Sequence, residues 1–293
     1  MRVDLNLLQN CELNLLQQIA QICETEHINY WLSGGSLIGA VKSQGMIPWD
    51  DDVDVGMLRP DYERFVQAVQ EKYDQHDRYA LVTDLTDADY GVTWSKFIDR
   101  QTEIKENFPF STNTAFIDIM PFDRVADNTL IQNWDKFSFH IVDQLVRERY
   151  HIAKHSIFGQ LLYLPFRMMF HRLSLQQLKA FRLHLMTRRN ETDARIVMSY
   201  ASWFDWGHEW VRISEVHQTT KVPFNDADLR IPKHHHAILK RMYGDISQTP
   251  PKSKQHPDHV KAFRFRTTKK QRHLTEAQTV EAQKQTTVSV RSN

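Results

Sequence analysis

The first half of the chain alternates between helical and extended patterns of apolar residues. Apolar side chains at three- and four-residue spacings predict an amphipathic helix over residues 5–25, and Pro60 predicts the first turn of another helix. Short apolar or alternating runs predict strands at residues 28–32, 52–57, 79–83, 92–98 and 115–120. This order of elements indicates an α+β fold built on a mixed α/β sheet.

The second half of the chain lacks this alternation. Residues 130–190 are predicted to be mostly helical, and residues 161–170 are their most apolar stretch, with basic residues on both sides. Such a stretch is typical of a helix at a membrane interface and equally of a core helix with solvated basic flanks, so both interpretations stay open. We expect a core over residues 1–125, a mostly helical region packed on it over 126–270, and a disordered tail without aromatic residues over 271–293.

Composition is that of a globular protein and excludes several classes of site. The 293 residues are 41% hydrophobic and 25% charged, with a net charge of +1. No apolar run reaches the roughly 18 residues that a membrane-spanning helix needs, and the N-terminus has no apolar signal region. Cys11 and Cys23 are the two cysteines, which excludes a disulfide framework and a cysteine-rich zinc site. We therefore expect a cytoplasmic protein.

The small net charge conceals a strong separation of charge along the chain. Residues 1–143 contain 11 Lys and Arg against 24 Asp and Glu (net −13), whereas residues 144–293 contain 26 against 12 (net +14). Such asymmetry favours contact of the basic half with an anionic partner or a membrane surface. Arg182, Arg188 and Arg189 are the expected contact residues, and an ordinary solvated surface is the alternative.

The most informative pattern follows the first predicted strand. Gly34, Gly35 and Ser36 lie between that strand and a short predicted helix, where backbone N–H groups and a hydroxyl can hold a phosphate. Asp52 and Asp54 follow on a predicted strand, and residues two apart on a strand face the same side. Two adjacent carboxylates are unfavourable without a cation, and Mg²⁺ takes carboxylate ligands beside substrate phosphates. The pattern predicts a metal and phosphate site.

A third acid is predicted on a neighbouring strand. Asp118 lies within the apolar run 115–120, where a lone carboxylate is costly unless it is paired or binds a metal. We expect Asp118 to be the third metal ligand or to accept a proton in the reaction. Asp50 adds a carboxylate near the other acids, whereas Asp51 and Asp123 are expected to be turn or cap residues.

These residues form part of a longer pattern. The stretch GGSLIGAVKSQGMIPWDDDVDVGMLRPDYERF at residues 34–65 closely resembles the signature of the LicD (fukutin-like) phosphotransferase family. That family resembles a branch of the polymerase-β-type nucleotidyltransferase superfamily, so the resemblance implies a nucleotidyltransferase-like core. The similarity continues at residues 94–104, 116–123 and 222–251 and covers roughly residues 5–255.

The resemblance also implies a site and a reaction. Gly35 and Ser36 match the phosphate turn, and Asp52, Asp54 and Asp118 match the metal-binding acids. Bacterial members resemble enzymes that move phosphocholine, or a similar phospho-alcohol, from a CDP-activated donor to a hydroxyl of a cell-surface glycan or teichoic acid precursor. The expected cofactor is Mg²⁺ or Mn²⁺, the expected donor is CDP-choline or another CDP-alcohol, and the nucleotide product is CMP. We expect no nucleic-acid partner.

Three basic residues are candidates for binding the donor phosphates. Lys96 matches a basic position of the family and falls on a predicted strand, while Lys42 and Arg59 lie near the acidic strand in the sequence. Arginine and lysine both bind phosphate groups, and ordinary ion pairs with nearby acids are the alternative for each residue.

Aromatic residues supply candidates for ring stacking. Trp49 precedes the acids and is expected either to stack on the nucleobase or to pack under the loop. Trp203 and Trp206 lie in an aromatic cluster that has the composition of a cation–π cage for choline, or of a piece of core.

The family interpretation leaves two other functions open. One is a nucleotidyltransferase that moves a nucleoside monophosphate from an NTP to a small molecule and releases pyrophosphate. The other is a non-catalytic homologue that binds a glycan or a membrane. We expect an active phosphotransferase, because Asp52, Asp54 and Asp118 repel one another without a cation and have no use in an inactive homologue. We expect it to act at the cytoplasmic side of the membrane.

Overall fold

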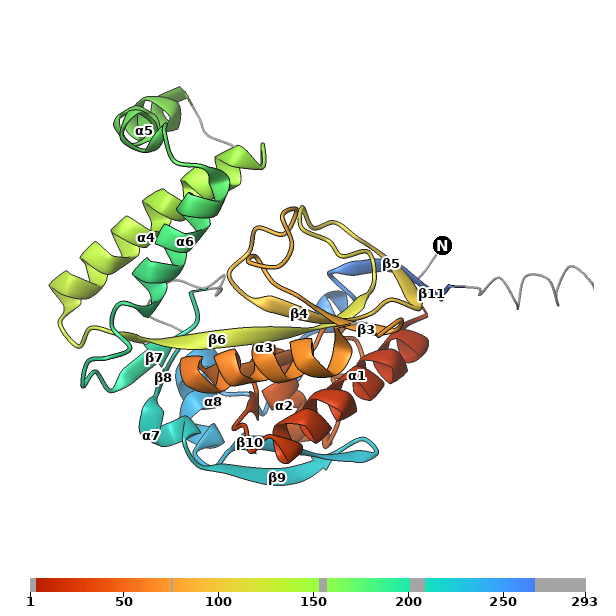
Figure 1. The fold of residues 1–293 in the computed structure, drawn as a ribbon. Helices are drawn as coiled ribbons and strands as arrows, with labels where there is room; N and C mark the ends of the chain where they lie inside the picture. The colour runs from red at the N-terminus through yellow and green to blue at the C-terminus, as the bar shows by residue number, and fades with distance from the viewer. Residues whose placement is uncertain (1–3, 75, 153–156, 201–208, 267–293) are drawn as a thin grey trace, which may run out of the picture.

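The computed structural model describes residues 4–74, 76–152, 157–200 and 209–266 (Figure 1). The helices are α1 (Leu5–Thr25), α2 (Gly34–Ser43), α3 (Arg59–Tyr73), α4 (Thr129–Arg149), α5 (Ile157–Phe170), α6 (Leu175–Thr187), α7 (Ile213–Val216), α8 (His235–Tyr243) and the 3₁₀ turn η1 (Lys252–Lys254). The strands are β1 (Trp31–Leu32), β2 (Asp54–Leu58), β3 (Tyr79–Val82), β4 (Ser95–Asp99), β5 (Thr102–Glu106), β6 (Ala115–Val125), β7 (Ile196–Met198), β8 (Trp210–Arg212), β9 (Thr219–Phe224), β10 (Ala227–Pro232) and β11 (Val260–Phe265).

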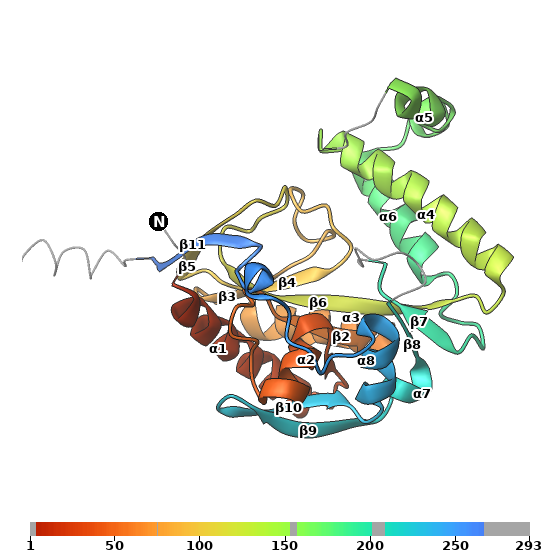
Figure 2. The same cartoon turned by 180° about the vertical axis from the view of Figure 1, so that it is seen from behind.

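A mixed sheet forms the centre of the molecule. Among the described residues it has seven strands, in which β1, β2, β6, β4 and β3 are neighbours in that order. Strand β2 runs parallel to β6, whereas β4 is antiparallel to it. The 11-residue strand β6 continues past these partners, and its last residues pair with β7, which carries β8 (Figure 2). Strand β6 therefore connects the two ends of the sheet.

Helices α1 and α3 cover one face of this sheet. The side chains of Val55, Phe97, Ile117 and Ile119 are fully buried in the same core as Phe65 of α3. Because successive residues of a strand point to opposite faces, the residues between them point away from these helices. Asp54, Lys96 and Asp118 of the central strands are thus on the face that α1 and α3 leave open.

The end of the described chain returns to the first half. Strand β11 pairs antiparallel with β5, and β9 and β10 form a separate hairpin. The segment before β11 is held by Asp51, whose carboxylate accepts backbone N–H groups of Asp258, His259 and Val260 at 3.2, 2.9 and 2.6 Å. Residues more than 200 positions apart in sequence therefore lie together beside β2.

The predicted α+β class with a mixed sheet is confirmed, but the mostly helical C-terminal part is not. The helix predicted over residues 5–25 coincides with α1, and α4 to α6 are helices as expected. Strands β7 to β11 then follow, and β7 and β8 extend the central sheet. Strands β7 and β8 have three residues each, too few to show the alternation that identifies a strand. The nucleotidyltransferase-like core and the division at residue 125 stay predictions, and the tail 271–293 lies outside the described residues.

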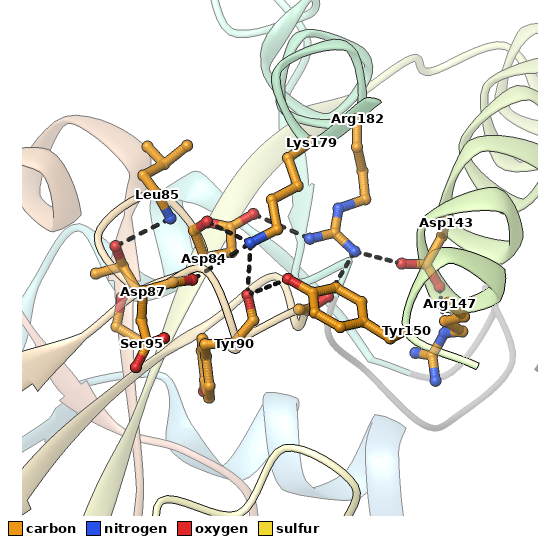
Figure 3. Close-up of polar contacts among 12 residues, drawn as sticks. Asp84, Leu85, Asp87, Tyr90, Ser95, Asp143, Arg147, Tyr150, Lys179 and Arg182 are labelled. Carbon is orange, nitrogen blue, oxygen red and sulfur yellow. Dashed lines mark hydrogen bonds and ion pairs between the residues drawn. The ribbon is translucent and has the colours of Figure 1, made fainter. Parts of the chain in front are cut away.

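The surface contact expected of Arg182, Arg188 and Arg189 is wrong for Arg182, and the other two arginines are engaged by an acid. Arg182 is fully buried, and its guanidinium donates to the carboxylates of Asp143 and Asp84 at 2.7 and 2.9 Å and to the carbonyl oxygen of Gly91 (Figure 3). Arg188 and Arg189 both bond to the carboxylate of the buried Asp135 on α4. Acids of the first half therefore pair with all three arginines, and Arg182 is enclosed, whereas Arg188 and Arg189 stay partly exposed.

Lys179 of α6 fixes the segment between β3 and β4 in the same region. Its ammonium donates to the carbonyl oxygens of Asp84, Asp87 and Tyr90 at 2.8, 3.4 and 2.8 Å (Figure 3). The hydroxyl of Tyr150, at the end of α4, donates to the carbonyl oxygen of Ala88 at 2.6 Å. The basic residues of α6 therefore attach the helices to the chain that leads into β4.

Candidate active site

A row of charged side chains crosses the three central strands. In the strand register Asp54 of β2 lies beside Asp118 of β6, and Lys96 of β4 lies opposite Asp118 on its other side. Residues paired across strands share a face, so these three side chains point into the same space. The indole N–H of Trp94 donates to Oδ1 of Asp118 at 2.9 Å and orients that carboxylate.

The glycines that open α2 lie where two carboxylates approach the backbone closely. Gly34 has a φ of +55°, and a Cβ at this position would lie 2.7 Å from Oδ2 of Asp54. A Cβ on Gly35 would lie 2.7 Å from Oδ2 of Asp50. The hydroxyl of Ser36 accepts the backbone N–H of Asp54 at 3.0 Å. Gly34, Gly35 and Ser36 thus form the first turn of α2, whereas the sequence placed them before the helix, and they pack directly against the acids. Their role in binding phosphate stays a prediction.

The charged residues of the central strands open onto one cavity of about 450 Å³. Asp52, Asp54, Asp118, Lys96 and Trp94 all line it. The other lining residues come from β5 and the chain after it, from β6 and from the segment before β11: Glu106, Asn107, Phe108, Phe116, Met120, Asp258 and His259. A cavity of this size is in the range that accepts a ligand the size of a nucleotide.

Crowding of acids raises the pKa of several carboxyl groups. Burial, then the charges of Asp52 and Asp118, raises the pKa of Asp54 well above its usual value. Burial raises the pKa of Asp118 to about 6, although the ammonium of Lys96 opposes the shift. Burial and the charges of Asp52 and Asp51 raise the pKa of Asp50 to about 8. A bound divalent cation would favour the charged form of each group, so the donor set fits Mg²⁺ or Mn²⁺.

The most compact group of possible ligands differs from the predicted triad. In the described ranges, ligand atoms of Asp51, Asp52 and His259 lie within 4.8 Å of one another, and no other such group of His, Cys, Asp or Glu is found there. Asp51 already accepts three backbone N–H groups, whereas Nε2 of His259 lies 3.4 Å from Oδ2 of Asp52. Asp52, Asp54 and Asp118 share the cavity at wider spacing.

Comparison with known proteins decides the family. A family model described as "LicD/FKTN/FKRP, nucleotidyltransferase domain" matches residues 27–170, which include β2, β4, β6 and the acids that they carry. This chain belongs to the LicD family. The resemblance found in the sequence is therefore confirmed.

Three relatives of this LicD-family chain are named as transferases of phosphocholine or ribitol 5-phosphate. It is 25% identical to the lipopolysaccharide cholinephosphotransferase LicD of Haemophilus influenzae over 256 residues, which are 85% of this chain and 93% of that protein. It is 30% identical to the ribitol 5-phosphate transferase FKRP of Mus musculus over 119 residues, 38% of this chain and 21% of that protein. It is 42% identical to the human FKRP over 55 residues, 17% of this chain and 11% of that protein. The chain is thus similar to transferases, and in the case of LicD over most of its length.

Sequence reasoning missed two buried acidic residues close to the acids of the cavity. Asp51 was expected in a solvated turn, but it is buried and holds the segment that carries His259. Glu12 of α1 is also buried, and burial together with the charges of Asp52 and Asp51 raises its pKa well above the usual value. Neither has a signal of its own in the sequence, although Glu12 does interrupt the apolar face of α1.

Two predicted phosphate ligands lie away from the cavity. Arg59 is buried in an ion pair with Asp123, at 2.8 and 2.6 Å, and this pair takes Asp123 out of the turn role expected for it. The ammonium of Lys42 donates to the carbonyl oxygens of Ser247 and Gln248 at 3.3 and 3.4 Å. Neither cation is among the residues that line the cavity, so the structure gives no support to their role with the donor.

Lys96 is the predicted cation that the structure places beside the acids. Its ammonium is buried 3.5 Å from Oε1 of Glu106 and lies 3.2 Å from the centre of the Phe116 ring. Phe108 packs on the same ammonium at 5.1 Å. Lys96 thus provides positive charge at the apolar end of the cavity.

The aromatic side of the cavity is not formed by the tryptophans that the sequence suggested. Trp94, Phe108 and Phe116 line it, and the rings of Trp94 and Phe108 lie 6.0 Å apart. Trp49 is half-buried and does not line this cavity. Trp203 and Trp206 lie outside the described residues, so their cage role stays a prediction.

Proposed function

We propose that this LicD-family chain transfers a phospho-alcohol from a CDP-activated donor to a hydroxyl of a cell-surface glycan or teichoic acid precursor, at the cytoplasmic side of the membrane. The observation that carries the proposal is the row of Lys96, Asp118 and Asp54 across three adjacent strands, facing one cavity. Similarity to a cholinephosphotransferase and to ribitol 5-phosphate transferases supports the class of group transferred.

In this proposal Asp52, Asp54 and Asp118 hold Mg²⁺ or Mn²⁺ against the diphosphate of the donor. The cation supplies charge neutralisation for the phosphate oxygens as the nucleotide leaves. The raised pKa values of Asp54 and Asp118 support this role, because burial first and neighbouring carboxylates second disfavour the charged forms that a bound cation would stabilise. Lys96 neutralises a phosphate oxygen from the opposite side of Asp118.

The reaction is a displacement at the phosphorus that carries the alcohol. The acceptor hydroxyl oxygen forms the new bond to this phosphorus, the bond to the CMP oxygen breaks, and CMP leaves with the electron pair. The hydroxyl proton passes to the carboxylate of Asp118. The N–H of Trp94 bonded to Oδ1 of Asp118 leaves Oδ2 to take this proton.

Choline is the alcohol that the proposal favours. Trp94, Phe108 and Phe116 give the cavity an aromatic wall, and ring faces bind a quaternary ammonium. LicD of Haemophilus influenzae, which aligns over most of this chain, is named as a cholinephosphotransferase. Ribitol is the alternative, since the FKRP proteins are named as ribitol 5-phosphate transferases.

Incubation of the purified chain with Mg²⁺ and separate CDP-choline, CDP-ribitol, CDP-glycerol and NTP donors tests the proposal. We expect CMP release from one CDP-alcohol, stimulated by a glycan or teichoic acid precursor and abolished by EDTA. Release of pyrophosphate from an NTP would instead establish a nucleotidyltransferase, which the description of the matching domain makes the second candidate. If every donor is bound but none is consumed with any acceptor, the non-catalytic alternative holds.

A further inference from the structure

We propose that α5 and the adjoining face of α4 dock on an anionic lipid surface. Helices α4, α5 and α6 project from the body of the molecule, and α5 lies at the outer end of this projection in both views (Figures 1 and 2). No described helix is long and apolar enough to cross a bilayer, so the contact is one of a helix lying on the surface.

Helix α5 is apolar on the side that it buries and on the side that it exposes. Tyr163, Phe166 and Phe170, spaced three and four residues apart, pack against α4 and α6. The opposite side presents Leu161, Leu162, Leu164, Met168 and Met169, which are 64, 58, 48, 68 and 68% exposed. A helix that is hydrophobic all round is normally enclosed, so the outer side of α5 lacks a partner within the described chain.

The exposed apolar face continues onto α4. Trp134 and Phe137 are 62 and 46% exposed on α4, and their rings lie 5.9 Å apart. Phe137 in turn meets Phe166 of α5, with ring centres 6.1 Å apart. Leu161, Leu162, Leu164, Met168 and Met169 of α5, with Trp134 and Phe137 of α4, form what we name the α4–α5 patch. Tryptophan, phenylalanine and leucine are the side chains that enter the interfacial layer of a bilayer.

Basic side chains near the α4–α5 patch favour a negatively charged binding partner. The sequence contains no Asp or Glu between Glu148 and Glu191. Arg149, before α5, and Arg172, after it, are exposed. The acids of α4 are engaged by arginines: Asp135 by Arg188 and Arg189, Asp143 by Arg147 and Arg182, and Glu148 by Arg167. Positive charge near the patch is therefore unopposed at the surface, which favours phospholipid head groups.

A second copy of the chain fits the patch less well. Two-fold pairing would place the same surface of each copy against the other, and would bring Arg149 and Arg172 of both copies to one interface that supplies no free acid of α4 to pair with them. A lipid surface accepts the apolar side chains without a complementary shape and supplies the counter-charge. The patch therefore indicates a lipid surface.

Flotation of the full-length chain with vesicles tests this proposal, in EDTA to exclude bridging by metal ions. Phosphatidylcholine vesicles are compared with vesicles that also contain phosphatidylglycerol. We expect binding to the mixed vesicles, weakened by salt, and a loss of about tenfold or more in partitioning for the double variant Met168→Gln/Met169→Gln. Arg149→Gln/Arg172→Gln should lose binding to the mixed vesicles in the same assay.

Leu85→Gln is the matched control, because Leu85 is 66% exposed on the segment after β3, away from the patch. It should bind vesicles as the unchanged chain does, and unchanged melting temperatures should show that all variants fold. The proposal is overturned if the unchanged chain fails to float with anionic vesicles at low salt, or if Met168→Gln/Met169→Gln floats equally well. Concentration-dependent dimers that this double variant abolishes, without vesicle binding, would assign the patch to a second copy.

Discussion

At the scale of single residues, a few close contacts fix the carboxylates of the site. Asp54 is held by the hydroxyl of Ser36 on its backbone N–H and is approached by the backbone of Gly34 on its carboxylate. Asp118, its neighbour across the strands, is oriented by Trp94. Each carboxylate is thus fixed in place while carrying a charge that burial disfavours.

Replacement of one of these acids should separate function from folding. We expect Asp54→Asn to lower transfer by roughly 100-fold or more, because the amide no longer supplies charge to a cation. The same change should maintain or raise the melting temperature in EDTA, because it removes repulsion among the acids. It should also reduce the increase in melting temperature that Mg²⁺ causes. The exposed Asp228→Asn on β10 is the control. Equal Mg²⁺ stabilisation of Asp54→Asn and the unchanged chain would contradict the metal assignment.

Alanine substitutions at two glycines with positive φ separate the effect of backbone strain from the effect of displacing Asp54. Gly34 (φ +55°) and Gly244 (φ +71°) should each lose about 1–3 kcal/mol of stability on replacement by alanine. A Cβ at Gly34 would lie 2.7 Å from Asp54, whereas nothing lies within 4 Å of one at Gly244. We therefore expect both variants to melt earlier but Gly34→Ala alone to lose transfer. Chemical denaturation and a transfer assay measure this, and parallel losses of transfer would contradict it.

At the scale of elements, the active face is assembled from segments that meet only after folding. Strands β2, β4 and β6 contribute Asp54, Lys96 and Asp118 through their register. Asp51 brings the segment before β11 to the same edge, and with it His259. Lys179 and Arg182 of α6 hold the chain that leads into β4.

Removal of the Asp51 charge should release the segment before β11. Because its carboxylate accepts three backbone N–H groups, we expect Asp51→Asn to lower the free energy of unfolding by about 1–3 kcal/mol. Amide exchange at Val260 should become faster, as measured by hydrogen–deuterium exchange. Asp258→Asn, at an exposed neighbouring carboxylate, is the control and should leave this exchange unchanged. Unaltered protection of Val260 in Asp51→Asn would refute the structural role.

At the scale of the whole molecule, most acids and arginines named above are either gathered at the cavity or paired with one another in the interior. Acids of the first half gather at the cavity, while three acids of α4 and the arginines beside them neutralise one another. The exposed Arg149 and Arg172 stand before and after α5, and α5 lies at the outer end of the helical projection (Figure 1). The catalytic face and the proposed lipid-binding face are therefore formed by different parts of the chain.

This concentration of acids predicts the pH dependence of stability without metal. Folding raises the pKa of Asp50 from 3.8 to about 8 and that of Asp118 to about 6, so the folded chain binds protons more tightly than the unfolded chain. The resulting stabilisation is complete below about pH 4 and is lost as the pH rises through 6 towards 8. We expect the melting temperature in EDTA to fall over that window and Mg²⁺ to reduce the fall. An identical slope with and without Mg²⁺ would contradict a cation site at these acids.

The sequence by itself determined the local features of this protein. The bounds of α1, the glycine turn, and Asp52 and Asp54 two residues apart on an extended segment all follow from spacing, because backbone geometry repeats over a few residues. The family pattern followed from the same contiguous stretch, and the family model confirmed it.

Only the tertiary structure decided which distant residues meet. Strand register placed Lys96 beside Asp118, and Asp51 found its partners more than 200 residues away. Arg59, which the sequence placed near the acids, pairs instead with Asp123, and Arg182 is enclosed by acids of other segments. Spacing cannot specify these pairings, because they depend on the packing of the whole chain and on the cost of leaving any buried charge without a partner.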